Sequence, residues 1–210
     1  MVNTISNIIV AASAIVVAVA AIVGINTWRK ELAGKAIFEA AKKLMESAYK
    51  VVDSYQWTAS LMTSSGESID RARQSNESDA MKQVLDEWYA KSKRFELLLK
   101  NYNNLSEANW EVRTIIGSEA VKGIEEKLIS IKSEIVNLSS AIFSYFDIRK
   151  READYLGTRQ IDLEFVSKMH KIIYQAPDSD EIKKLNNLVI DLEKEFAPYL
   201  RGAGRRQKKL

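Results

Sequence analysis

Side chains able to perform chemistry are few in this sequence, and they form no known catalytic motif. There is one histidine, His170, and no cysteine, so the chain lacks the ligands of a His-rich or thiolate metal site and a thiol nucleophile. No G-x-x-x-x-G-K-[ST], G-x-G-x-x-G or H-E-x-x-H pattern occurs. We therefore interpret His170 as a helix-surface or boundary residue, and we predict no catalytic residue, no metal site, no cofactor and no enzymatic activity.

Two carboxylate clusters are the remaining candidates for acid–base or metal chemistry. One consists of Glu125 and Glu126, and the other of Asp191, Glu193 and Glu195. Neighbouring residues on a helix point about 100° apart, and lysines are interleaved with both clusters. Charges of mixed sign in this arrangement are typical of solvated helix surfaces, which is how we interpret both clusters.

An uncharged apolar run covers residues 8–25. At about 1.5 Å per residue, its 18 residues nearly match the hydrocarbon core of a bilayer. A buried helix of a soluble protein usually keeps a polar stripe, and a signal peptide starts with basic residues; this run has neither feature. The sequence therefore predicts a transmembrane anchor over residues 1–27.

Basic residues flank this segment on its C-terminal side alone, beginning with Arg29, Lys30 and Lys35. The positive-inside rule then places the N-terminus outside and the remaining chain in the cytoplasm. We expect a single-pass protein of the inner (cytoplasmic) membrane, with Trp28 at the headgroup boundary.

Small side chains recur along one face of the predicted span, at spacings of four and three residues: Asn7, Ala11, Ala14, Ala18 and Ala21. Small residues allow helices to approach closely in lipid, so this stripe predicts self-association into a homo-oligomer. The alternative is that alanine is simply common in bacterial spans.

The remaining chain reads as helical throughout. Its apolar residues repeat at spacings of three and four, it has few glycines and prolines, and no stretch alternates with a period of two. We predict an all-α fold in which one N-terminal transmembrane helix continues into a cytoplasmic antiparallel bundle of four or five helices, over residues 28–200.

The predicted bundle helices differ in the strength of their patterns. The strongest stripe consists of Val121, Ile124, Leu128, Ile131, Ile135, Leu138, Ile142 and Tyr145. A second consists of Met81, Leu85, Trp88, Ser92, Phe95, Leu99 and Tyr102, widened by Val84 and Leu98, and we expect residues 101–110 to interrupt it. We expect a loop with one helical turn at residues 64–78, Ser78 as a helix cap, and a last helix that ends before Pro198. Five aromatic residues are predicted to fill the core: Trp88, Phe95, Trp110, Phe143 and Tyr145.

The last ten residues carry five cations, Arg201, Arg205, Arg206, Lys208 and Lys209. With two glycines and little apolar surface, residues 201–210 are predicted to be a disordered basic tail. Its charges suit the anionic inner leaflet, and nucleic acid is a possible partner through this tail alone. A solubilising tail without a fixed target is the simpler alternative.

The stretch TWRKELAGKAIFEAAKKLMESAYKV, residues 27–51, resembles the juxtamembrane segment of uncharacterised bacterial single-pass proteins with a W-[RK]-x-E-L-x-G-K motif. The layout is more loosely similar to the accessory membrane protein of type VI CRISPR loci. That resemblance implies a HEPN-related helical domain, an oligomeric membrane pore and a role in antiviral defence. HEPN ribonucleases use Arg and His four to six residues apart, whereas ten residues separate Arg159 from His170, so the nuclease site is not carried over.

Three functions are compatible with these features. The leading hypothesis is a non-enzymatic, membrane-anchored helical protein that self-associates, as in a defence-linked membrane effector or pore. The second is a monomeric membrane anchor or adaptor whose bundle docks a cytoplasmic protein partner. The third is a divergent HEPN-like RNase that depends on His170.

Overall fold

A computed structural model describes residues 2–61, 64–118, 122–154 and 163–200. These residues form α-helices and one short 3-10 helix, and none of them lies in a β-strand. In chain order the elements are α1 (Val2–Ala59), η1 (Ser65–Ser68), α2 (Asp79–Ile116), α3 (Lys122–Asp154), α4 (Leu163–Ile173) and α5 (Asp180–Leu200). The all-α fold class is therefore confirmed. The tail at residues 201–210, with Arg201, Arg205, Arg206, Lys208 and Lys209, lies outside the described residues.

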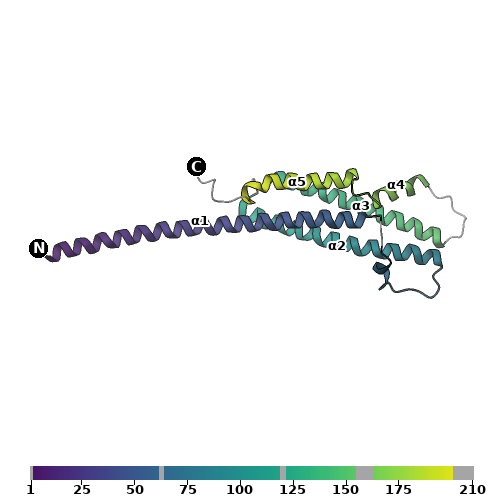
Figure 1. Cartoon of the computed structure of the whole chain (residues 1–210), viewed down its shortest axis with the longest axis horizontal. Coiled ribbons are helices and arrows are strands. Elements are labelled where there is room, and N and C mark those ends of the chain that lie inside the picture. The colour runs from purple at the N-terminus through teal and green to yellow at the C-terminus, as the bar shows by residue number, and fades with distance from the viewer. Residues whose placement is uncertain (1, 62–63, 119–121, 155–162, 201–210) are drawn as a thin grey trace.

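Helix α1 continues for 58 residues without a break. Its first half projects alone, whereas its second half lies among the other helices (Figure 1). From Ser13 onward, where side-chain burial is described, the first buried residue is Ala40, and buried side chains then recur up to Ala59. Within the described chain, the part of α1 from Ser13 onward is the one helix long and apolar enough to cross a membrane, and its apolar segment is unburied. The prediction that the apolar segment runs directly into the first bundle helix is confirmed.

The other helices pack around the second half of α1. This half contacts α2 most extensively and then α5, while α3 contacts α2, α4 and α5. The four long helices lie lengthwise beside one another, and the short α4 lies at the end far from the N-terminus (Figure 1). Their buried apolar residues form one contiguous core. The predicted stripe of α3 belongs to it, through Ile124, Leu128, Ile131, Ile135, Leu138, Ile142 and Tyr145, whereas Val121 lies outside the described residues.

The register of α2 differs from the prediction. Met81, Val84 and Leu98 are buried as expected, but the centre of the buried face is a line with a spacing of seven residues, formed by Val84, Lys91, Leu98, Leu105 and Val112. Residues 101–110 do not interrupt the helix, because Leu105 and Ala108 continue the buried face while the asparagines lie on other faces. The prediction of a break was wrong, since asparagine lowers helix propensity only modestly where core positions continue the pattern.

Two of the aromatic predictions were also wrong. Trp110 and Phe143 are each more than half exposed, whereas Tyr145 is buried and Trp88 and Phe95 are partly buried. Trp110 lies on α2 away from its buried residues Ala108 and Val112, and Phe143 lies on α3 beside the buried Ile142, outside the buried stripe of that helix. Trp88 and Phe95 lie on a face of α2 at the edge of the core. The contact between α2 and α3 is therefore open to solvent along part of its length.

The predictions of one helical turn and of a helix cap before α2 are confirmed. Residues 64–78 contain the single turn η1, and the Ser78 hydroxyl accepts a hydrogen bond from the Met81 amide at 3.2 Å, as expected of a helix cap. At the other end of the chain, α5 includes Pro198 and ends at Leu200. The helix was expected to end sooner, but a proline in the last turn removes only one hydrogen bond near the end of the helix.

Candidate functional site

The predicted membrane stripe lies on the projecting half of α1. Ala14, Ala18 and Ala21 are exposed there, and Asn7 and Ala11 belong to the same helix. Large apolar side chains are exposed on the same segment, including Ile15, Val16, Val17, Val19, Ile22 and Val23. This part of α1 therefore offers all of its described surface to a lipid or protein environment.

The carboxylate clusters are engaged in contacts across the helix surfaces. Glu195 pairs with Lys127, Asp191 with Lys194 at 2.8 Å, and the Tyr49 hydroxyl donates to Glu193 at 3.0 Å. Glu125 similarly lies 2.7 Å from Arg113. Within the described residues, no three His, Cys, Asp or Glu side chains are grouped so as to hold a metal ion. These contacts agree with the interpretation of both clusters as solvated helix surfaces.

His170 is exposed near the end of α4, as the sequence suggested. Its ring makes a tilted contact with that of Tyr174, with centroids 4.5 Å apart, and lies 5.9 Å from the ring of Tyr145. The structure therefore places this imidazole in an aromatic contact at the edge of the bundle.

Two buried cations lie at the end of α1, and the sequence analysis did not identify them. Lys91 is 0% exposed, and its amine donates to the carbonyls of Thr58 and Ser60 at 2.8 Å each and to that of Ile173 at 3.4 Å. These carbonyls lie at the C-terminal ends of α1 and α4, where backbone acceptors have no partner within the helix. One ammonium group therefore caps two helices.

Arg94 is one turn further along α2 and is 2% exposed. Its Nε and Nη2 donate to the two oxygens of Glu67 at 2.6 and 2.5 Å, and its Nη1 donates to the Trp57 carbonyl and the Ser60 hydroxyl. The guanidinium also lies 5.1 Å from the ring of Trp57. Hydrogen bonding to Arg94 lowers the pKa of Glu67, so this carboxylate is held in its charged form. The bidentate pair fixes η1 against α2, and the Nη1 contacts of Arg94 tie both to the end of α1.

Polar contacts from the segment after α4 complete this cluster. The backbone N–H of Gln175 donates to the Ala59 carbonyl at 2.7 Å, and its side-chain amide donates to the Tyr55 hydroxyl. The Tyr174 hydroxyl donates to Glu87, and the Lys91 amine lies 4.3 Å above the Tyr174 ring. Burial raises the pKa of Tyr174, so its hydroxyl stays protonated and able to donate.

The chemistry of this cluster follows from what its groups already bind. Burial, and secondly the neighbouring Arg94, lower the pKa of Lys91 to about 7, a value at which an amine can act as a nucleophile. However, the amine is directed at three backbone carbonyls, and Lys91 is not among the residues that line the pockets at Trp88, Phe95, Met81 and Tyr55. The arrangement therefore serves to hold α1, α2, η1 and α4 together.

A signal for this cluster exists in the sequence. Lys91 occupies one position of the seven-residue repeat that otherwise reads Val84, Leu98, Leu105 and Val112. A single cation within an unbroken apolar repeat indicates a buried charge with a specific partner. The partner carbonyls lie more than 30 residues away, so only the folded chain identifies them.

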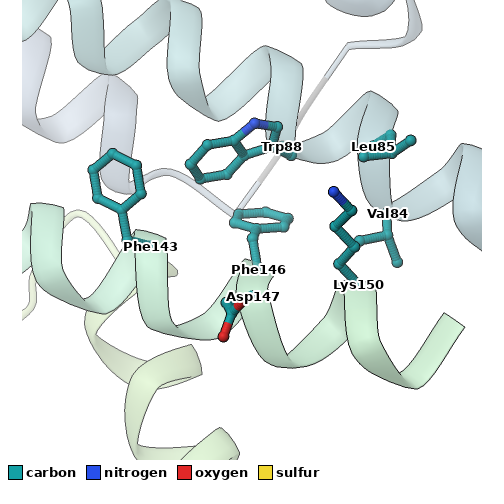
Figure 2. A pocket seen from close by; sticks show the side chains of 7 residues that line it. All are labelled: Val84, Leu85, Trp88, Phe143, Phe146, Asp147 and Lys150. Carbon is teal, nitrogen blue, oxygen red and sulfur yellow. The ribbon is translucent and has the colours of Figure 1, made fainter. Parts of the chain in front are cut away.

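An apolar groove lies between α2 and α3. Trp88 points from α2 toward α3, and its ring makes edge contacts with Phe143 at 5.3 Å and Phe146 at 5.4 Å (Figure 2). The pocket here has a volume of about 240 Å³. A second pocket of about 460 Å³ continues along the same helices past Phe95, Leu99 and Val136. The groove is thus built largely from residues that the sequence placed in the core.

Comparisons with family models, with curated proteins and with solved structures give no match. The functional assignment therefore rests on the geometry of this chain. The resemblances to bacterial single-pass proteins and to the type VI accessory protein remain predictions.

Replacing Lys91 by methionine tests whether the cation cluster stabilises the bundle. The substitution keeps an unbranched chain but leaves the carbonyls of Thr58, Ser60 and Ile173 without this donor, so we expect a loss of about 2–4 kcal/mol in the free energy of unfolding. The matched control is Lys93→Met, because Lys93 pairs with Glu96 on the surface. Chemical denaturation should show a change within about 0.5 kcal/mol for the control. Equal stability of both variants would contradict this role.

The pH dependence of stability provides a separate test of Lys91. Its pKa in the folded chain is lowered to about 7, whereas a lysine in an unfolded chain titrates near pH 10.4. Between these values the unfolded chain binds more protons, so the contribution of Lys91 to the free energy of unfolding rises with pH. We expect the stability difference between the natural chain and Lys91→Met to grow from about pH 7 to pH 9, by at most about 1.4 kcal/mol per pH unit. A constant difference would show that the carbonyls keep the amine charged throughout.

Proposed function

We propose that this chain is a non-enzymatic, membrane-anchored helical protein that self-associates, with its N-terminus outside and an antiparallel helical bundle in the cytoplasm. The observation that carries the proposal is the division of α1 into an apolar half that the bundle leaves exposed and a half that the bundle buries. Both halves belong to one continuous helix.

The exposed half of α1 suits a bilayer. Large branched side chains such as Ile15, Val19 and Ile22 are more than half exposed, and burying such side chains away from water stabilises each by about 1.5–3 kcal/mol. No helix of the bundle packs against this part of α1, so the bundle leaves these side chains uncovered. The flanking cations begin at Arg29, which supports a cytoplasmic bundle by the positive-inside rule.

The contacts made by the buried polar side chains support a role without catalysis. The two buried cations, Lys91 and Arg94, are directed at backbone carbonyls and at Glu67, and they join helices. Such groups contribute to stability and positioning. The small-residue stripe that includes Ala14 and Ala18 supports self-association in the membrane.

Membrane topology can be tested with single cysteines, because the chain has none of its own. We expect Thr4→Cys to react with an impermeant thiol reagent in whole cells. Cysteine at Ser167, which is exposed on α4, should react only after the membrane is permeabilised. The protein should also remain in the membrane fraction after carbonate extraction. Reversed labelling would contradict the orientation, and release by carbonate would contradict the anchor.

Self-association through the span can be tested with the double variant Ala14→Leu/Ala18→Leu. Larger side chains on this face should prevent close helix approach and lower the oligomer mass in light scattering in detergent, without preventing insertion. The matched control is Ile15→Leu/Val19→Leu, which changes neighbouring bulky positions on the same helix. Unchanged mass for the alanine variant would reject the stripe as the interface, and a monomeric natural chain would reject self-association.

A further inference from the structure

A pocket of about 460 Å³ lies between α3 and α4. Helix α4 lies beside α3 at the end of the bundle far from the N-terminus (Figure 1). The buried Tyr55 of α1 and the exposed Glu181 of α5 also line the pocket, so four helices contribute to it. Its volume is within the range of about 300–1,000 Å³ that is typical of small-molecule sites.

The two walls of this pocket differ in chemistry. Helix α4 contributes apolar side chains from one of its faces, at spacings of four and three residues: Phe165, Met169 and Ile172. Helix α3 contributes Ala141 and a row of polar side chains: Glu134, Asn137, Ser140 and Ser144. An apolar wall opposite a polar one suits a molecule that has an apolar part and a polar part.

Glu134 is the buried charge of the polar wall. It lies on the buried face of α3, between Ile131 and Leu138, and is 7% exposed. Its Oε1 pairs with Lys184 of α5, whose side chain is 58% exposed. Its Oε2 accepts no hydrogen bond from the residues that the structure describes. A buried carboxylate is stabilised well only where its remaining lone pairs are also hydrogen-bonded, so Oε2 is an available acceptor in the pocket wall.

Tyr55 supplies an available donor to the same pocket. It is 1% exposed, and its hydroxyl accepts a hydrogen bond from the Gln175 side chain at 3.3 Å. Among the described residues, no acceptor takes the proton of this hydroxyl. Burial, supported by the charges of Glu134 and Glu181, raises the pKa of Tyr55 to about 12, so the hydroxyl keeps its proton at neutral pH.

The charges around the pocket indicate the class of ligand. Lys168 and Glu181 line it as exposed residues of opposite sign, so their effects on a bound charge largely offset each other. Glu134 is the buried charged residue among those that line the pocket, and it is negative. Its pair with Lys184 shows that this carboxylate accepts an ammonium group. The pocket therefore favours a cation over an anion.

We propose that the pocket between α3 and α4 binds a small organic amine, whose ammonium group pairs with Glu134 and whose apolar part packs against Met169 and Ile172. Where the ligand also carries an oxygen acceptor, the Tyr55 hydroxyl donates to it. The site belongs to the bundle and does not depend on the anchoring proposed above, so either proposal can fail without the other.

NMR of the full chain in a neutral detergent, with isotope-labelled methionine methyl groups, tests this site. Met169 lines the pocket, whereas Met45 is buried in α1, and Met169→Leu identifies the signal. Phenethylamine should shift the Met169 signal until it saturates, without moving that of Met45. Phenethyl alcohol has the same size but no charge and should bind about tenfold or more weakly, and phenylacetate should not bind. No saturable shift with the amine, or equal affinity for the alcohol, would overturn the proposal.

The role of Glu134 is tested by Glu134→Gln, which keeps the shape of the side chain and removes its charge. The affinity for phenethylamine should fall about tenfold or more, because the ammonium loses a charged acceptor. Glu126→Gln, at an exposed position of the same helix outside the pocket, is the control and should bind as the natural chain does. Circular dichroism verifies that both variants are folded. Unchanged affinity in a folded Glu134→Gln would overturn the proposal.

Lys184→Met provides an arm that does not require Glu134 to be changed. It leaves the buried carboxylate without its partner, so the melting temperature should fall. Phenethylamine should restore most of this loss, whereas phenethyl alcohol should not. Lys183→Met, at the neighbouring exposed lysine, is the control and should show neither effect. A loss that the amine does not restore would overturn the proposal, since Glu134 would then serve only as the structural partner of Lys184.

Discussion

The rest of the structure depends on how the buried end of α1 is satisfied. Its last carbonyls lie inside the bundle, where an unpaired acceptor would cost about 1–3 kcal/mol. Lys91 and Arg94 supply donors from α2, and the Gln175 amide supplies one from the segment after α4. The groups that satisfy α1 are thus the ones that fix α2, η1 and α4 in place. A substitution that disturbs this end of α1 would therefore affect most of the helix contacts in the bundle.

Burying two cations is unfavourable unless the site compensates for the lost hydration. Three features do so here. Glu67 neutralises Arg94 through a bidentate pair, the carbonyls at the ends of α1 and α4 carry the partial negative charge of helix C-termini, and the rings of Tyr174 and Trp57 face the two cations. Arg94 is therefore paired by charge, whereas Lys91 depends on neutral dipoles, which explains why burial lowers the pKa of Lys91.

The sequence predicted the parts of this fold that follow from local pattern. The stripe of α3, the Ser78 cap and the continuity of α1 all follow from residue spacing and from the absence of helix breakers. The register of α2 could not be predicted in this way. Its core positions include Lys91 and Arg94, and a pattern that counts charged residues as solvent-facing moves the predicted stripe onto Trp88 and Phe95. The wrong register of α2 and the missed cation cluster have the same cause. Lys91 and Arg94 can be core residues only because α1 offers its last carbonyls to them, and this pairing exists only in the folded chain.

The position of α5 bears on the partner of the basic tail. Helix α5 runs antiparallel to α1, because Gln175 meets Ala59 while Glu193 meets Tyr49, so Leu200 lies near the end of the bundle from which α1 projects (Figure 1). The 14 residues at 26–39 separate the apolar run from the bundle by about 20 Å. Ten residues after Leu200 can extend at most about 33–36 Å, which exceeds that distance. With the topology proposed above, a chain of this length starting at Leu200 could reach the inner leaflet, and we therefore propose anionic lipid ahead of nucleic acid as the partner of its five cations.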